Sequence, residues 1–247
     1  MATDEIHTWC TSLDQPGSLV RKLFDTLSVD EEERAGRFYF LEDRNRFIVR
    51  HGILRTVLGY YLGVAAKELQ FCYGANGKPR VADPFREGAI SFSMSSSVGL
   101  AIFAFTRNHE IGIDVEFVRD LPEMDEIADR LFSTRESKVY RGLPETLKKN
   151  AFFACWTRKE AFVKATGDGL SRPLNKLEMT VDPGDPAKLV SIDTDAKSAS
   201  RWSIYDLKPA FGFSGAIAAE AGCCRVRCWQ WTNGHQPRLS TQGMRRM

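Results

Sequence analysis

The chain has 247 residues, of which 43% are hydrophobic and 27% charged, an ordinary composition for a globular protein. Its 34 basic and 32 acidic side chains leave a net charge of +2, which argues against a protein whose main partner is nucleic acid or an anionic membrane. No apolar run approaches the ~20 residues of a membrane helix, and the N-terminus lacks the order of a signal peptide, so we expect a cytoplasmic protein with reduced cysteines.

The first half of the chain predicts helices followed by strands. Residues 28–34 read as a helix start with Ser28 as the cap, and residues 42–58 repeat apolar side chains at helical spacing. A glycine-rich turn lies at 74–81. The extended segments predicted after it are 89–95, 100–106 and 111–116.

The second half predicts more helices and then short strands. The predicted helices cover 124–132, a segment beginning at Ser133, and 150–166, which ends at Gly167. The predicted strands are 177–181, 188–192, 201–207, 215–220 and 224–231. Strands clustered around a few helices predict an α+β fold.

Residues 111–116, IGIDVE, place two carboxylates on an otherwise apolar strand. Because side chains repeat every two residues along a strand, Asp114 and Glu116 project in the same direction, roughly 6–7 Å apart. Two anions this close repel one another unless a cation lies between them. A divalent metal is one interpretation, and a solvated sheet face is the other.

A second carboxylate stands in the helical segment WTRKEAFVK at 156–164. Glu160 and Lys164 are four residues apart and share one helix face. Alone, they would be explained by a surface ion pair worth ~0.3–0.5 kcal/mol.

Together the two motifs resemble the signature of the 4′-phosphopantetheinyl transferases, in the long single-chain class that activates polyketide and nonribosomal peptide synthetases. IGIDVE is followed by FFACWTRKEAFVKATGDGLSRPL, and the resemblance extends upstream to RFYFLEDRNRF, NGKP and ISFSMSSSVG. It implies an α+β fold of two similar lobes, each a small, mostly antiparallel sheet packed with helices. We place these lobes at 1–108 and 109–231, with a disordered tail at 232–247.

The resemblance also implies a reaction. The 4′-phosphopantetheine group of coenzyme A would pass to a serine of an acyl or peptidyl carrier protein domain, and adenosine 3′,5′-bisphosphate would leave. Asp114, Glu116 and Glu160 are implied to bind Mg²⁺, a hard ion that prefers oxygen ligands. Lys164 matches the family lysine that contacts the phosphates. Glu136 matches a residue suggested as general base, although its place three residues after Ser133 also explains it as a capping-box glutamate.

Residues of the first lobe are implied to hold the nucleotide of coenzyme A. Arg34 and Arg46 match basic positions near the 3′-phosphate, and Gly77, Lys78 and Pro79 match the turn beside the nucleotide. The planar fork of an arginine suits phosphate, but a solvated surface position remains the alternative for each of them.

One position departs from the family pattern. The family has a histidine that contacts phosphate within the block that stands here as Phe92 to Ser97, and Ser96, after Ser95, occupies that place. Because a serine hydroxyl carries no charge, we expect weaker coenzyme A binding unless another base compensates. Arg50 and His51 are the possible substitutes.

Two alternatives remain open at this point. The chain could be a non-catalytic relative that binds coenzyme A or a carrier, or another Mg²⁺-dependent phosphoryl-chemistry enzyme such as a nucleotide hydrolase. As a transferase we expect it to be a monomer that binds coenzyme A and a carrier domain, with neither nucleic acid nor a membrane as partner.

Overall fold

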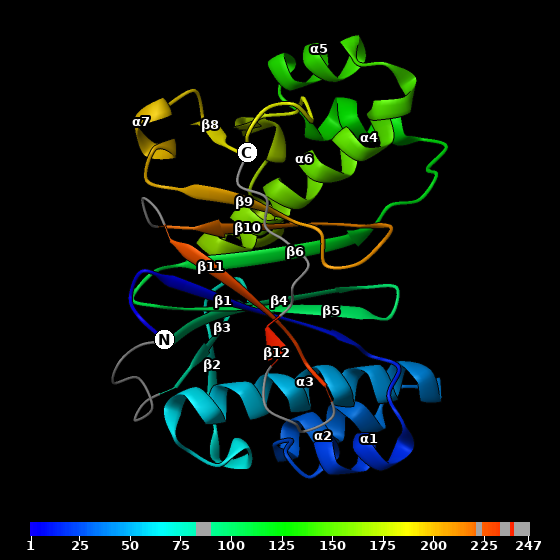
Figure 1. Ribbon diagram of the computed structural model, residues 1–247, viewed down its shortest axis with the longest axis vertical. Helices are drawn as coiled ribbons and strands as arrows, with labels where there is room; N and C mark the ends of the chain where they lie inside the picture. Colours follow the sequence, from blue (N-terminus) through cyan, green and yellow to red (C-terminus); the bar gives the residue numbers. More distant parts are fainter. Residues whose placement is uncertain (83–89, 221–223, 233–237, 240–247) are drawn as a thin grey trace.

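Two β-sheets face each other in the computed structural model, and helices cover their outer faces (Figure 1). The structure describes residues 1–82, 90–220, 224–232 and 238–239. The first sheet has the order β12-β11-β1-β5-β4 and the second the order β6-β10-β9. The strands of the first sheet are β1 (Glu5–Ser12), β4 (Ile90–Ser97), β5 (Leu100–Arg107), β11 (Arg225–Gln230) and β12 (Arg238–Leu239). Those of the second are β6 (Ile111–Phe117), β9 (Ser203–Leu207) and β10 (Phe213–Ala219).

The helices form the two outer layers. The first layer holds α1 (Gly17–Phe24), α2 (Val29–Gly36) and α3 (Leu41–Leu62). The second holds α4 (Met124–Leu131), α5 (Thr134–Gly142) and α6 (Glu145–Thr166). The smaller elements are η1 (Ala66–Glu68), β2 (Phe71–Tyr73), β3 (Pro79–Val81), η2 (Gly169–Ser171), η3 (Leu174–Lys176), β7 (Leu177–Met179), β8 (Leu189–Ile192) and α7 (Ala196–Ala199).

Apolar side chains fill the spaces between the layers in three clusters. One lies between α1, α3 and the first sheet, and a second lies between α6 and the elements around it. The third lies between the sheets, where Ile102 of β5 meets Ile111, Ile113 and Val115 of β6. The alternating apolar residues of IGIDVE are therefore the inner face of the second sheet, which leaves Asp114 and Glu116 on the face toward α6.

Strand β6 lies very close to α6 because residue 112 is a glycine. A Cβ atom at Gly112 would lie 2.0 Å from the carbonyl oxygen of Ala161 and 2.4 Å from the amide nitrogen of Ala165. No side chain fits there, so this glycine fixes the distance between the strand that carries Asp114 and the helix that carries Glu160.

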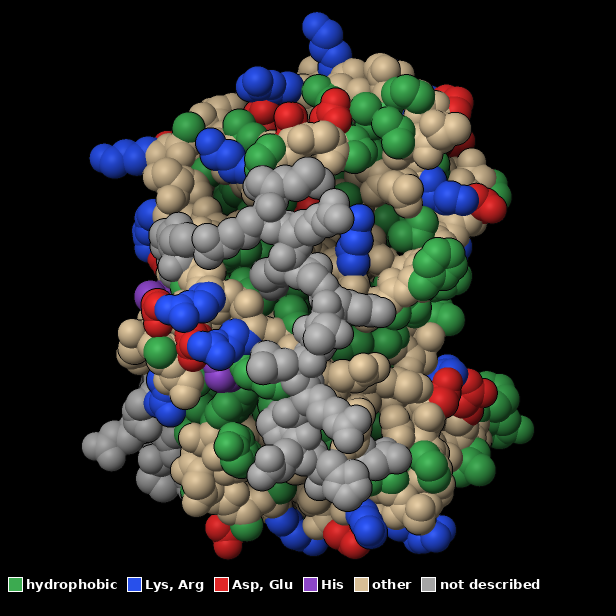
Figure 2. Space-filling view, viewed as in Figure 1, with side chains coloured by type: hydrophobic (Ala, Val, Ile, Leu, Met, Phe, Trp, Pro, Cys, Tyr) green, Lys and Arg blue, Asp and Glu red, His purple; other side chains and the backbone are tan. Residues whose placement is uncertain are grey.

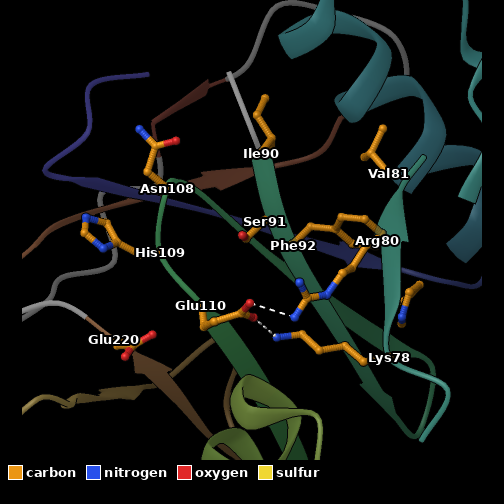
Figure 3. Close-up of a pocket in the computed structure, with 11 residues that line it drawn as sticks. Lys78, Arg80, Val81, Ile90, Ser91, Phe92, Asn108, His109, Glu110 and Glu220 are labelled. Carbon is orange, nitrogen blue, oxygen red and sulfur yellow. Dashed lines mark hydrogen bonds and ion pairs between the residues drawn. The ribbon is translucent and has the colours of Figure 1, made fainter. Parts of the chain in front are cut away.

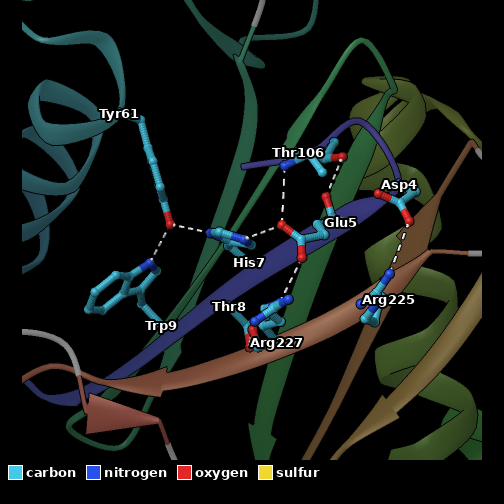
Figure 4. Close-up of polar contacts among 10 residues, drawn as sticks. Asp4, Glu5, His7, Thr8, Trp9, Tyr61, Thr106, Arg225 and Arg227 are labelled. Atoms are coloured by element: carbon cyan, nitrogen blue, oxygen red, sulfur yellow. Dashed lines mark hydrogen bonds and ion pairs between the residues drawn. The ribbon is translucent and has the colours of Figure 1, made fainter.

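Strand β11 returns to the first sheet and pairs with β1 in parallel. Polar contacts join these strands to each other and to α3 (Figure 4). Arg227 Nε lies 2.7 Å from Glu5 Oε1, and His7 Nδ1 lies 2.7 Å from the hydroxyl of Tyr61, which also accepts from the indole of Trp9. The first sheet therefore takes strands from both ends of the sequence.

The α+β class and the main elements are as the sequence predicts. The helices at 42–58 and 150–166 are confirmed as α3 and α6, and the strand at 111–116 as β6. Strand β1 and helix α1 were not predicted. The division into lobes at 108/109 stays a prediction. One strand does not follow it: β11 was assigned to the second lobe but lies in the first sheet. The tail at 232–247 lies mostly outside the described residues, apart from Thr232 and β12.

On the face shown in Figure 2, basic and acidic side chains of the described residues are interspersed. Over the described ranges, every helix is too short or too polar to span a membrane.

Candidate functional site

The site is centred on Asp114, where β6, β4 and α6 meet. Lys164 of α6 donates from Nζ to Asp114 Oδ1 at 2.7 Å, and the carboxylate is only 5% exposed. Lys164 also donates to Ser95 Oγ at 3.0 Å, and Ser95 donates to the same oxygen of Asp114 at 2.8 Å. Residues from three elements distant in sequence therefore share one carboxylate oxygen.

Serines at every second position of β4 connect this strand to β6. Ser97 Oγ donates to Glu116 Oε2 at 3.0 Å and accepts from the amide of Phe117 at 3.2 Å. Ser93 Oγ accepts from the amide of Ile113 at 3.1 Å. Ser93 and Ser97 were not among the predicted site residues, although serine at alternate positions of ISFSMSSS is the signal that would have pointed to them.

The second and third carboxylates of the prediction lie in the same electrostatic environment. Burial raises the pKa of Glu160, and the negative charges of Asp114 and Glu116 raise it further, while Lys164 opposes the shift. Burial likewise raises the pKa of Glu116, with Asp114 adding to it. The three acids therefore act on one another as like charges, and Lys164 opposes the shift at both glutamates.

The chemistry of this group suits a divalent cation. Asp114 Oδ2 is buried and has no hydrogen-bond partner within the described residues, and over the same ranges no partner is recorded for Glu160. Carboxylate oxygens of this kind are the ligands that Mg²⁺ prefers. Over the described part of the chain, however, no three His, Cys, Asp or Glu side chains are already gathered as a metal cluster, and an ammonium occupies the other oxygen of Asp114.

Glu136 lies apart from this group. It is 1% exposed, and its Oε2 accepts from Lys159 Nζ at 2.7 Å, itself fully buried. The same oxygen accepts from the amide of Ser133, as the capping box predicts, and Oε1 accepts from the amide of Met179 at 2.6 Å. Lys159 completes its three donations at the carbonyls of residues 174 and 177. Both oxygens of Glu136 thus hold α5, α6 and β7 together, and no recorded contact among the described residues joins Glu136 to Asp114, Glu116 or Glu160.

Lys78 lies just before β3 and connects this part of the chain to Glu110 and α6 (Figure 3). Its Nζ donates to Glu110 Oε2 at 2.6 Å and to the carbonyl oxygen of Ala165 at 2.5 Å. Burial lowers its pKa, and Glu110, which also pairs with Arg80 at 2.7 Å, opposes that shift. Lys78, Arg80 and Glu110 line a pocket of about 340 Å³. The ammonium of Lys78 is therefore occupied.

The turn before Lys78 is ordered by its own backbone. Gly77 has a φ of +81°, and its amide donates to the carbonyl of Gly74 at 2.9 Å, which aligns Pro79 at the start of β3. Asn76 Nδ2 donates to the carbonyl oxygen of Gly167 at 3.0 Å, so the turn contacts the C-terminal end of α6. The predicted nucleotide turn and the predicted phosphate helix are thus in contact.

The predicted arginines differ in their partners. Arg46 pairs with Asp14 at 2.7 Å and with Glu42 at 2.6 Å, so its charge is neutralised within the protein. Arg34 lies over the ring of Phe47 at 5.4 Å, and no ion pair is recorded for it among the described residues.

Comparisons with known proteins agree on one family. A family model described as the 4′-phosphopantetheinyl transferase superfamily matches residues 110–219, which include Asp114, Glu116, Glu160 and Lys164. The 4′-phosphopantetheinyl transferase HetI of Nostoc sp. is 40% identical over 231 residues, 94% of this chain and 94% of that protein. The 4′-phosphopantetheinyl transferase Sfp of Bacillus subtilis is 29% identical over 194 residues, 78% of this chain and 82% of that protein.

Proposed function

The chain belongs to the 4′-phosphopantetheinyl transferase superfamily, and we propose that the group around Asp114 transfers phosphopantetheine from coenzyme A to a serine of an apo carrier protein. The serine oxygen forms a bond to the phosphorus that bears pantetheine, the bond from that phosphorus to the diphosphate bridge breaks, and adenosine 3′,5′-bisphosphate leaves. One observation supports the proposal most directly. Lys164 and Ser95 both donate hydrogen bonds to Asp114 Oδ1, while Asp114 Oδ2 is buried without a hydrogen-bond partner in the described part of the chain.

The acidic residues are proposed as the Mg²⁺ ligands. Asp114, Glu116 and Glu160 supply oxygen donors. Burial and then the charge of Asp114 raise the pKa values of both glutamates, and a cation would relieve the repulsion from Asp114. Bound Mg²⁺ would neutralise charge on the diphosphate.

Lys164 is proposed to contact the phosphates. Its ammonium is one-third exposed and stands beside Asp114, so it can stabilise the negative charge that grows on the leaving group. Ser95 positions the ammonium through a hydrogen bond of 3.0 Å.

The proton of the attacking serine is proposed to pass to Glu160, directly or through water. Burial raises the pKa of Glu160, which favours proton uptake by an oxygen of this carboxylate that the metal does not hold. The prediction that Glu136 is the base stays a prediction, and its burial with both oxygens engaged argues for a positioning role instead.

Transfer to a carrier is the direct test. The protein is incubated with coenzyme A, Mg²⁺ and a panel of apo carriers from fatty-acid, polyketide and nonribosomal peptide synthases, and the carriers are weighed by mass spectrometry. A gain of roughly 340 Da marks the phosphopantetheine modification. Asp114→Asn should lower kcat at least about 10²-fold, the loss typical of a removed electrostatic group. Asp120→Asn is the control, because Asp120 is 93% exposed and pairs only with Lys149 at 2.7 Å in the described part of the chain.

The outcomes separate the proposal from its alternatives. Binding of coenzyme A without any carrier mass gain would support the non-catalytic relative, for which the serine at position 96 is the argument. Release of a nucleotide without a carrier would support a hydrolase. Equal rates for Asp114→Asn and Asp120→Asn would exclude the site.

A monomer is proposed as the working form. One chain supplies β4, β6 and α6, the three elements that meet at Asp114. Light scattering of the purified protein at the concentration of the transfer assay tests this, and a stable dimer would contradict it.

A further inference from the structure

Serines of β4 lie where the two large sheets meet edge to edge. Strand β4 ends the first sheet and β6 ends the second, and no backbone ladder joins these two strands in the described structure. An edge strand leaves alternate amides without a backbone partner. Ser93 and Ser97 accept hydrogen bonds from two such amides of β6, those of Ile113 at 3.1 Å and Phe117 at 3.2 Å. Hydroxyl groups thus take the place of a neighbouring strand.

The same face of β4 also holds the two carboxylates of β6. Ser95 donates to Asp114 at 2.8 Å, and Ser97 donates to Glu116 at 3.0 Å. Ser96, between them, points away and accepts a hydrogen bond of 3.0 Å from an arginine of α3. Because both strands repeat every two residues, each carboxylate of β6 is matched with one serine of β4.

The hydroxyl of Ser97 is oriented by the backbone. Its oxygen accepts from the amide of Phe117, and its single hydrogen is directed to Oε2 of Glu116. Ser93 makes the corresponding contact with an amide of β6, but no carboxylate partner is recorded for it among the described residues. Ser97 therefore links the backbone of β6 to a side chain of the same strand.

Glu116 has one oxygen held and one oxygen open within the described ranges. Besides Ser97, Oε2 has Arg119 near it, but Nη1 of Arg119 is 3.7 Å away and the side chain of this arginine is 49% exposed. No partner is recorded for Oε1 over the same ranges. A free glutamate side chain has many rotamers to lose, so the shorter bond from Ser97 is the contact that sets its direction.

We infer that Ser97 is a positioning residue for the transfer. It holds Oε2 of Glu116 in the free protein, which leaves Oε1 for a divalent cation that Asp114 also binds. The inference rests on the proposed function, which assigns the cation to the three carboxylates, and it adds a residue that acts through one of them. Removing a group that orients a metal ligand typically lowers metal affinity about 10- to 100-fold.

Mn²⁺ binding followed by electron paramagnetic resonance tests the inference without catalysis. Mn²⁺ is titrated into the protein with coenzyme A present and no carrier, and the signal of the free hydrated ion gives Kd. Ser97→Ala should raise this Kd about 10- to 100-fold. Ser97→Thr keeps the hydroxyl and should stay within about 3-fold of the wild type. Asp114→Asn should also weaken binding, and an unchanged Kd for that variant would overturn the inference because the ion would then lie elsewhere.

Ser93→Ala is the matched control. It removes a hydrogen bond to an amide of β6 from the same face of β4, but no bond to a carboxylate. It should bind Mn²⁺ like the wild type at a temperature at which calorimetry shows every variant folded. Equal weakening by Ser93→Ala and Ser97→Ala would overturn the inference, because it would show that both serines only join the sheets.

Steady-state kinetics separate this inference from the proposed function. Ser97→Ala should need about 10-fold more Mg²⁺ for half of its maximal rate, while kcat at saturating Mg²⁺ stays within about 3-fold, because Glu116 itself is still present. If the wild type transfers but Ser97→Ala keeps the wild-type dependence on Mg²⁺ and Mn²⁺, the inference is wrong and the function stands. If the wild type modifies no carrier but its Mn²⁺ affinity depends on Ser97, the function is wrong and the positioning of Glu116 stands.

Discussion

Replacing Glu136 by glutamine distinguishes a catalytic base from a positioning residue. The substitution keeps the shape of the side chain but removes its charge, so the ammonium of Lys159, which is fully buried, loses its only anionic partner in the described part of the chain. The two carbonyls that remain around Lys159 accept hydrogen bonds but carry no net charge.

The expected loss of stability is large because both groups are buried. Breaking one side of a buried ion pair costs about 3–5 kcal/mol of the free energy of unfolding. For a chain of 247 residues, the entropy of unfolding near the midpoint is about 0.5 kcal/mol/K, so Tm should fall by about 6–10 °C. The double variant Glu136→Gln/Lys159→Met should recover most of this loss, because it leaves no unpaired charge.

Calorimetry gives Tm, and transfer kinetics below the onset of unfolding give kcat. The positioning role predicts a kcat for Glu136→Gln within about 3-fold of the wild type, whereas loss of a general base costs about 10²- to 10⁴-fold. Glu33→Gln is the surface control: Glu33 is 63% exposed and lies 3.6 Å from Arg37, so its loss should cost at most about 1 kcal/mol. An unchanged Tm together with a kcat reduced about 10³-fold would refute our reading and restore Glu136 as the base.

Three further outcomes are expected. Acidification from pH 7 to pH 5 should lower the free energy of unfolding by about 2 kcal/mol through His51, because burial lowers the pKa of His51 to about 3 whereas the unfolded chain, with a pKa near 6.5, takes up the proton first. In urea titrations at several pH values, His51→Gln should lack this part of the pH dependence of the unfolding free energy. An unchanged pH dependence would contradict the prediction. Gly112→Ala should lower the free energy of unfolding by about 3 kcal/mol or more, because the added methyl group would collide with the backbone of α6. Gly142→Ala should be nearly neutral, because a Cβ atom there has no neighbour within 4 Å. Equal urea midpoints for the two variants would show that α6 shifts at little energetic cost. Ser95→Ala should lower kcat/KM about 10-fold or more, because the ammonium of Lys164 loses the hydrogen bond that holds it beside Asp114, while Tm should change little. Wild-type kinetics of this variant would show that Ser95 does not position Lys164.

Local patterns predicted the parts of the fold that depend on local sequence. The alternation in IGIDVE and the helical period at 150–166 were enough for β6 and α6, and the capping box from Ser133 to Glu136 is present as predicted. Strand β1 was not predicted, because it is stabilised by pairing with β5 and with β11, and β11 lies at the other end of the chain. Nothing in the local sequence indicates such a distant parallel pair.

The side-chain contacts of the site also could not be predicted from local sequence. The sequence suggests that Lys164 pairs with Glu160 one helical turn away, but its ammonium binds Asp114, fifty residues earlier. Arg46 pairs with Asp14, a partner that the sequence did not indicate, and its place near a phosphate stays a prediction. The residue types identify candidate groups, but the choice of partner depends on which elements the fold brings together.

The alternation of side chains along β4 explains how a serine can occupy position 96 without changing the Asp114 group. Because its side chains alternate, a change at position 95 or 97 acts on Asp114 and Glu116, whereas a change at position 96 acts on the α3 side. A histidine can therefore be absent from position 96 without disturbing the carboxylates, provided that α3 supplies a cation. Arg50 is such a cation, with its charge uncompensated in the described structure, so serine at position 96 is expected to alter nucleotide affinity rather than the chemistry of transfer.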